Sequence, residues 1–286
     1  MPELKEQDVR ERRGVPEAAA GDSRAWKAEA GVFLAVAFVA AGACGAVQPA
    51  TGIPAAVVQL TQFGPAAAVA AVAVLWPGRI RHRLAGALPG TGTGAAAAGD
   101  RAGTGRGPLL LLTAVLITAM GAGAYAMVAG SVPVTDPRSL EHPFALVVVA
   151  QLVGACGEEI GWRCLLQPLL RTRFGPLTAS ALVGVAWGLW HVQVFVRAPA
   201  YAAAFLAATV AMSVVLGLAL ERVRTNRLLL AGGFHTLVNL GMLLFMDEES
   251  GAVLPMVLFA GACLAVTIPW IRAAVRITSV AAHGAR

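Results

Sequence analysis

The sequence predicts an all-α fold, a polytopic membrane bundle of about eight transmembrane helices, and three observations support this. Of the 286 residues, 57% are apolar and 13% charged, with a mean hydropathy of +0.70. This composition is atypical of soluble domains and of disordered chains. The apolar residues gather in eight long stretches, without the alternating pattern of a membrane β-barrel. Backbone polar groups in hydrocarbon need partners within their own segment, so each stretch is expected to be a helix.

Each apolar stretch is about long enough for one crossing of roughly 20 residues. The expected crossings are residues 30–48, 54–76, 108–131, 143–170, 176–196, 201–220, 228–246 and 253–271. They form a bundle over residues 29–272, in which 143–246 supplies the catalytic core helices. The polar segments are expected to be a disordered cytoplasmic tail (1–28), a flexible cytoplasmic loop with Gly, Ala and Thr repeats (77–107) and a cytoplasmic C-terminal tail (273–286).

The distribution of cationic side chains predicts the orientation of this bundle. Of the 22 Lys and Arg residues, nineteen fall in the two tails and in alternate connections, which the positive-inside rule places in the cytoplasm. The opposite connections hold only Arg138 and Arg197, together with the acidic run 247–249. We therefore expect a multi-pass protein of the cell membrane with both termini cytoplasmic. The same rule explains the net charge of +6, so the expected partners are the lipid bilayer and a membrane-associated protein or peptide substrate, and not nucleic acid.

Ionisable side chains inside the apolar stretches are few. Each one costs about 2.5 to 3.5 kcal/mol in a bilayer interior, so each is a candidate for function. The candidates are Glu158, Glu159 and Arg163 in stretch 143–170, His191 in stretch 176–196, and His235 with Asn239 in stretch 228–246.

The two adjacent glutamates are expected to have different tasks. Glu159 and Arg163 are four residues apart, so they share one helix face and can form an ion pair. Glu158 points about 100° away from Glu159 and has no cation of its own. A desolvated carboxylate of this kind can accept a proton from water, which makes Glu158 the candidate general base.

The histidines and the asparagine supply complementary chemistry. His235 and Asn239 are also four residues apart, and both can donate hydrogen bonds to a developing oxyanion. His191 lies on the helix that follows the glutamates, and antiparallel neighbours joined by a short connection can bring it to Glu158. These groups can activate water and stabilise a tetrahedral intermediate. No Ser, Thr or Cys is paired with a base, so no covalent intermediate is expected.

Three motifs in this order resemble a known family. Glu158, Glu159 and Arg163, then His191, then His235 with Asn239, resemble the CPBP family of intramembrane proteases, also called Abi or CAAX-protease-like. The resemblance covers about 100 residues, and it implies a glutamic-type intramembrane endopeptidase without a cofactor. It also implies that Glu158 and His191 activate the water, that His235 and Asn239 form the oxyanion site, and that Glu159 and Arg163 support Glu158. One departure is Trp187, four residues before His191, where the family often has Phe.

Other functions stay open at this point. A zinc-dependent hydrolysis would use Glu158, His191 and His235 as metal ligands, although the usual HExxH motif is missing. A transporter would also bury Glu and His side chains, but the first half of the chain shows no second charged helix. A non-catalytic peptide-binding immunity protein is the third alternative, and the cost of burying unused polar groups counts against it.

Overall fold

The structure is a computed structural model. It describes residues 3–55, 57–87, 106–221, 223, 225–246 and 251–283, and within these ranges it describes the side chains of residues 25–276. All the regular elements in this part of the chain are helical, and it contains no strand. The predicted all-α class is therefore confirmed.

The described helices follow the order of the predicted crossings, with two additional short ones. The α-helices are α1 (Glu3–Thr51), α2 (Gly64–Leu75), α3 (Pro77–Arg83), α5 (Arg106–Ala129), α6 (Phe144–Gly161), α7 (Gln167–Arg171), α8 (Pro176–Trp190), α9 (Pro199–Leu220), α10 (Arg227–Phe245) and α11 (Val253–His283). Single turns of 3-10 helix occupy Leu60–Phe63 and Val192–Val196, and a π-helical turn, Trp162–Leu166, joins α6 to α7.

Eight apolar helices match the eight predicted crossings. Among the described residues, six are long and apolar enough to cross a bilayer, namely Ala25–Thr51, Arg106–Ala129, Phe144–Arg171, Pro199–Leu220, Arg227–Phe245 and Val253–Arg276. The other two, Leu60–Leu75 and Pro176–Trp190, are shorter. The second of these is about 22 Å long, less than the roughly 30 Å of a hydrocarbon core. This helix ends at Trp190, which is buried, and most residues of the 3-10 turn that follows are exposed.

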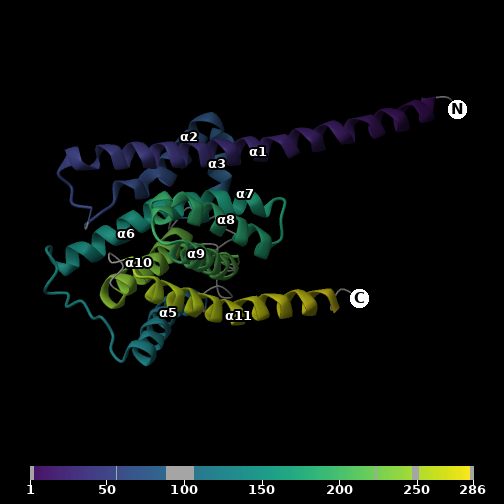
Figure 1. The fold of residues 1–286 in the computed structure, drawn as a ribbon. Helices are drawn as coiled ribbons and strands as arrows, with labels where there is room; N and C mark the ends of the chain where they lie inside the picture. Colours follow the sequence, from purple (N-terminus) through teal and green to yellow (C-terminus); the bar gives the residue numbers. More distant parts are fainter. Residues whose placement is uncertain are drawn as a thin grey trace.

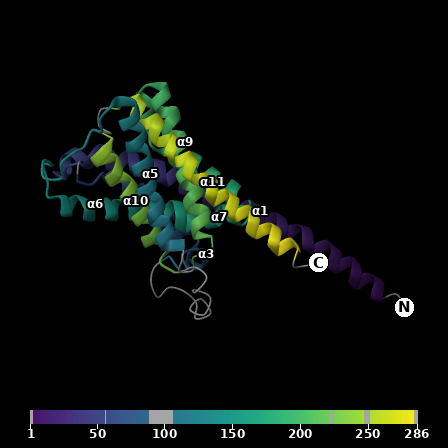
Figure 2. The ribbon, with the colours of Figure 1, turned by 90° about the horizontal axis from the view of Figure 1, so that it is seen from below.

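The helices pack as a curved row around α9 and α10 (Figures 1 and 2). α9 lies between α8 and α11, and α10 lies between α5 and α6. α1 packs along α2, which in turn contacts α6. α8 meets the α6 segment mainly at the π-helical turn and α7. The helices α6, α8 and α10 thus surround one interior region. The candidate residues lie on α6 and α10, at the end of α8 and, for Arg163, on the π-helical turn that follows α6.

Glycines allow the closest helix contacts. A Cβ atom at Gly184 of α8 would lie 2.7 Å from Val210 Cα of α9, and one at Gly232 of α10 would lie 2.5 Å from Cys156 Sγ of α6. A Cβ at Gly161 would lie 2.6 Å from Pro65 Cβ. Small residues at these positions let the backbones approach, which is the main source of packing energy between helices in lipid.

Helices extend into the polar segments. α1 begins at Glu3, so helix is present in the segment predicted as a disordered tail (1–28). α11 ends at His283, within the predicted C-terminal tail (273–286), to which no conformation was assigned. The first part of α1 projects beyond the other helices (Figure 1). Its Ala, Glu, Lys and Arg content favours helix, a local propensity that the prediction of disorder did not weigh.

The predicted loop 77–107 also contains a helix, α3, at its beginning. Glu29 of α1 is buried, and its two carboxylate oxygens bind Arg79 and Arg83 at 2.8 and 2.9 Å. This pairing fixes α3 against α1, and spacing along the chain did not reveal it. Residues 88–105, the low-complexity part of the predicted loop, lie outside the described residues.

Glycine-to-alanine substitutions test the close packing of α8 on α9. Gly184→Ala should destabilise the protein by about 1 to 3 kcal/mol, because the new methyl group meets backbone atoms of Thr209 and Val210 that cannot move independently. Gly31→Ala is the control, since no atom of a neighbouring segment lies within 4 Å of the added Cβ. Alanine has a higher helix propensity than glycine, so this variant should be as stable as the wild type or slightly more stable. Thermal unfolding in detergent measures both variants. Equal effects would contradict the packing described.

Candidate functional site

The candidate residues gather around the indole ring of Trp187 on α8. Trp187 Nε1 donates a 2.8 Å hydrogen bond to Glu158 Oε2. The His235 ring lies 5.1 Å from this indole and the His191 ring 6.0 Å, measured between ring centroids. The Arg163 guanidinium stacks on the same indole, with its carbon 4.9 Å from the ring centroid. The structure therefore brings together the charged side chains that the sequence placed on three separate segments.

Glu158 is buried, and its side chain retains 1% of its exposure. The Trp187 indole that binds it also contacts the His191 and His235 rings. Among the described residues, the Trp187 indole is the hydrogen-bond partner of this carboxylate. The second oxygen, Oε1, is thus the atom of Glu158 left to act on a small molecule such as water.

Glu159 faces the other way, into a buried charge cluster. Its Oε2 lies 3.1 Å from Arg163 Nε, and its Oε1 accepts a 3.0 Å hydrogen bond from Nδ1 of His235. Glu159 and Arg163 are fully buried in this contact. The predicted ion pair between them is present, and the bond to His235 is an addition that spacing along the chain did not show.

His191 lies at the end of α8, not inside a helix that continues to residue 196 as the sequence predicted. The α-helix stops at Trp190, and a 3-10 turn follows. His191 Nδ1 lies 2.8 Å from the carbonyl oxygen of Trp187. Since a carbonyl only accepts, Nδ1 carries the hydrogen, and Nε2 has a free lone pair when the ring is neutral. The rings of Trp190 and Phe205 pack against the His191 ring, with centroid distances of 4.9 and 5.0 Å, and fix its orientation.

Asn239 lies one turn beyond His235 on α10. Its amide nitrogen donates a 3.0 Å hydrogen bond to Gln151 Oε1 on α6. One of its two amide hydrogens is thus used, and the second is available for another acceptor. Gln151 orients this amide, just as Glu159 orients the imidazole of His235.

Sequence reasoning missed three features of this site. The motif pattern assigns Trp187 no role, although its Nε1–H is the hydrogen-bond donor to Glu158. Gln151 was overlooked, and a polar side chain seven residues before Glu158 in an apolar helix was the available signal. The π-helical turn that carries Arg163 has no signal in the sequence, and such turns often occur at functional sites.

The geometry of the hydrogen bonds bears on the zinc alternative. Among the side chains that the structure describes, no three His, Cys, Asp or Glu groups are close enough together to hold a metal ion. His191 and His235 both use Nδ1 in bonds to the protein, which is how metal-binding histidines are also held, so Nε2 is the atom each would offer. The arrangement thus gives metal binding no direct support.

Comparison with known proteins identifies the relatives of this segment. Residues 140–241 match the family described as type II CAAX prenyl endopeptidase Rce1-like. This range contains all six candidate residues, and it confirms the resemblance that the sequence indicated. Together with the apolar helices, the match supports a multi-pass membrane protein of the protease type.

Curated relatives cover a larger part of the chain. The chain is 22% identical over 173 residues to the lysostaphin resistance protein A of several Staphylococcus aureus strains, among them Newman and COL. The alignment spans 60% of this chain and 41% of each relative, so the chain matches less than half the length of those proteins.

Removing one charge from the buried cluster tests its role in folding. Glu159→Gln should destabilise the protein by about 3 to 5 kcal/mol, because Arg163 is then a buried cation without a counter-ion. The double variant Glu159→Gln with Arg163→Gln should recover much of this loss, since it leaves no unpaired charge. Unfolding midpoints of the wild type, both single variants and the double variant form the cycle. If the double variant loses as much free energy of unfolding as the two single variants together, the two charges are not paired.

Proposed function

We propose that the protein is an intramembrane endopeptidase of the CAAX-protease-like type, in which Glu158 and His191 activate the water that hydrolyses a peptide bond. The observation that carries this proposal is the position of Glu158. Its carboxylate is buried, and among the described residues it is hydrogen-bonded only to the Trp187 indole, which also contacts both imidazole rings. The family matched by residues 140–241 supports the endopeptidase part of this proposal.

The first step is attack by water on the peptide carbonyl. Glu158 Oε1 accepts one proton from the water, and His191 Nε2 accepts a hydrogen bond from the other, so that the oxygen attacks the carbonyl carbon. The Trp187 indole donates to the other carboxylate oxygen, Oε2, and so fixes the direction of Oε1. The proton on Glu158 then passes to the amide nitrogen, the C–N bond breaks, and the amine leaves. The carboxylic acid that remains gives its proton to His191 Nε2 and leaves as the carboxylate, and His191 passes that proton to the amine or to water.

His235 and Asn239 stabilise the oxyanion in this proposal. The Nδ1–H of His235 is bound to the Glu159 carboxylate, which stabilises a ring with hydrogens on both nitrogens. Nε2–H is then the donor to the oxyanion. Asn239 donates its second amide hydrogen, because Gln151 holds the first. The two histidines thus receive different roles from their partners, since a neutral carbonyl holds His191 and a carboxylate holds His235.

The proposed mechanism uses no cofactor, and zinc-dependent hydrolysis is the alternative. In that alternative Glu158, His191 and His235 hold a zinc ion, which would supply an activated water. The indole bond occupies Oε2 of Glu158, so Oε1 is the oxygen that would be left for either reaction. A transporter and a non-catalytic peptide-binding immunity protein are further alternatives, and the name of the staphylococcal relatives refers to resistance and not to cleavage.

The expected substrate is a membrane-associated protein or peptide. We propose that the protein acts in the plasma membrane with both termini in the cytoplasm, as the distribution of Lys and Arg predicts. The site lies among α6, α8 and α10, so a substrate must bring its scissile bond into the bundle.

A reconstituted cleavage assay tests the reaction. Glu158→Gln, His191→Ala and His235→Ala should each lower the cleavage of membrane-anchored peptides, prenylated CAAX peptides included, by at least about 100-fold. Trp187→Phe keeps the aromatic ring but removes the donor to Glu158, so it should lower kcat by about 10-fold or more with a smaller effect on KM. Mass spectrometry of the products measures the rates.

The controls of this assay separate the alternatives. Arg81→Gln, an exposed residue far from the site in sequence, should cleave like the wild type. Full activity after dialysis against a chelator supports the metal-free mechanism, whereas loss of activity that zinc restores supports the alternative. Cleavage that persists in Glu158→Gln would end the protease proposal for this site.

Labelling of single cysteines tests the orientation. In a variant that lacks the four native cysteines, Ser139→Cys should react with a membrane-impermeant maleimide in intact cells. Arg81→Cys should react only after the membrane is opened, because α3 is expected on the cytoplasmic side. The opposite pattern would reverse the proposed topology.

A further inference from the structure

Gln62 is a buried polar side chain without a partner among the described residues. It lies in the 3-10 turn Leu60–Phe63, just before α2, and retains 8% of its exposure. In the part of the chain that the structure describes, every other buried side chain with an acidic, basic, amide or hydroxyl group makes a hydrogen bond or an ion pair, whereas the Gln62 carboxamide makes neither. Buried polar groups are almost always paired, so this exception calls for an explanation.

The Gln62 carboxamide is not sealed inside the protein. The described side-chain atoms that are fully enclosed without a hydrogen bond belong to His142, Glu159, Trp162, Arg163, Gln167 and Arg227. Neither amide atom of Gln62 is among these enclosed atoms, and neither is Oε1 of Glu158. Both groups therefore keep accessible surface, which a ligand can reach.

Gln62 lies against the face of α6 that carries Glu158. A Cβ atom at Gly154 would collide with Gln62 Oε1. One at Gly157 would lie 3.2 Å from the Gln62 carbonyl oxygen. Gly154 is four residues before Glu158, so the two share one helix face, and a long helical side chain leans over the turn that precedes it. The Gln62 carboxamide and the Glu158 carboxylate therefore lie over the same turn of α6.

Hydrogen bonds to α1 fix the turn that carries Gln62. Gln48 of α1 donates from its amide nitrogen to the carbonyl oxygen of Val58 at 2.8 Å, and its Oε1 accepts from the Leu60 N–H at 2.9 Å. α2, which follows the turn directly, packs along α1 as well. A side chain on a segment held in this way is pre-organised, which lowers the entropic cost of binding a ligand.

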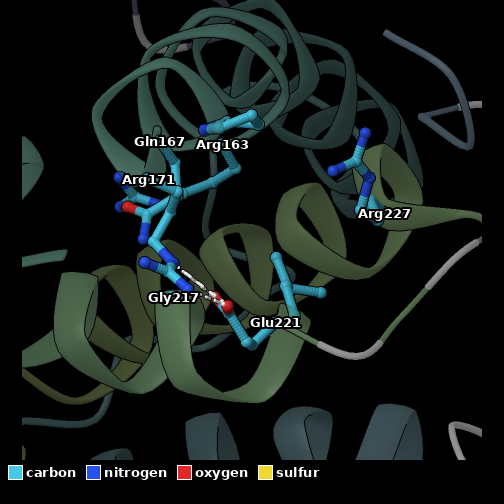
Figure 3. Close-up of a pocket in the computed structure, with 8 residues that line it drawn as sticks. Arg163, Gln167, Arg171, Gly217, Glu221 and Arg227 are labelled. Atoms are coloured by element: carbon cyan, nitrogen blue, oxygen red, sulfur yellow. Dashed lines mark hydrogen bonds and ion pairs between the residues drawn. The ribbon is translucent and has the colours of Figure 1, made fainter. Parts of the chain in front are cut away.

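The polar cavity at the ends of α7 and α9 and the start of α10 differs from this arrangement (Figure 3). Arg171 binds the Glu221 carboxylate, with its Nε 3.0 Å from both oxygens. Arg227 donates to the backbone carbonyl oxygens of Arg83 and Ala85 at 3.1 and 2.8 Å. These two guanidinium groups already have protein partners, so they offer no comparable site.

We propose that Gln62 binds the substrate, and that its carboxamide pairs with a backbone amide group next to the scissile peptide bond. This inference rests on the protease function proposed above. A carboxamide donates through its nitrogen and accepts through its oxygen, and a peptide chain offers the complementary carbonyl oxygen and N–H. Main-chain hydrogen bonds of this kind supply affinity that does not depend on the side chains of the peptide. Gln62 thus selects an extended polypeptide and not a particular residue.

Gln62→Met separates this role from a structural one. Methionine has a similar length but no amide, so the variant loses an unpaired polar group from an apolar contact. Its thermal stability should therefore equal or exceed that of the wild type. In the cleavage assay KM should rise by about ten-fold, while kcat changes by less than about three-fold. A carboxamide with a structural role would give a less stable variant instead.

A peptide that cannot be cleaved makes the test independent of the catalytic assignments. In this peptide a CH2–NH link replaces the scissile amide identified from the cleavage products. Its Kd is measured by fluorescence anisotropy with the full chain in nanodiscs, and Gln62→Met should raise this Kd by about ten-fold. Gln59→Met is the matched control, because Gln59 is exposed directly before the same turn and its side chain makes no capping hydrogen bond. This variant should bind the peptide like the wild type.

Ester substitutions in the peptide identify the group that Gln62 binds. Each one replaces a single backbone N–H by oxygen. At the position that faces Gln62, the ester should raise the Kd of the wild type by about five-fold or more and have no further effect in Gln62→Met.

The results separate this inference from the proposed mechanism. Cleavage that persists in Glu158→Gln contradicts the proposed base but leaves the assignment of Gln62 intact, because the Kd measurements involve no reaction. The assignment of Gln62 is overturned if Gln62→Met binds the peptide as tightly as the wild type, if this variant is less stable than the wild type, if Gln59→Met weakens binding equally, or if no ester position is coupled to Gln62.

Discussion

The Glu159 carboxylate is the interaction on which the described interior depends. It is buried between Arg163 of its own segment and His235 of α10, so one anion compensates a cation and orients an imidazole. In a low-dielectric interior an unpaired member of such a set would be strongly unfavourable. The position of α10 relative to α6 is therefore linked to charge pairing as well as to the close contact at Gly232.

Trp187 joins this cluster to the proposed reaction. One face of its indole carries the Arg163 guanidinium, its edge donates to Glu158, and its backbone carbonyl holds His191. A phenylalanine at this position has the same ring face and the same carbonyl, but it lacks the Nε1–H. The tryptophan therefore adds a fixed direction for the Glu158 carboxylate, which is useful to a base that must meet a single water molecule.

The sequence by itself determined the helical class, the eight apolar segments and the residue types of the site, because hydrocarbon excludes unpaired backbone and unneeded charge. It also determined the Glu159–Arg163 pair, since four residues make one helical turn. Only the tertiary structure decided that His235 binds Glu159, that Gln151 holds Asn239, and that α8 ends just before His191. These contacts join residues 76 and 88 positions apart or depend on where a helix stops, and no local spacing encodes them.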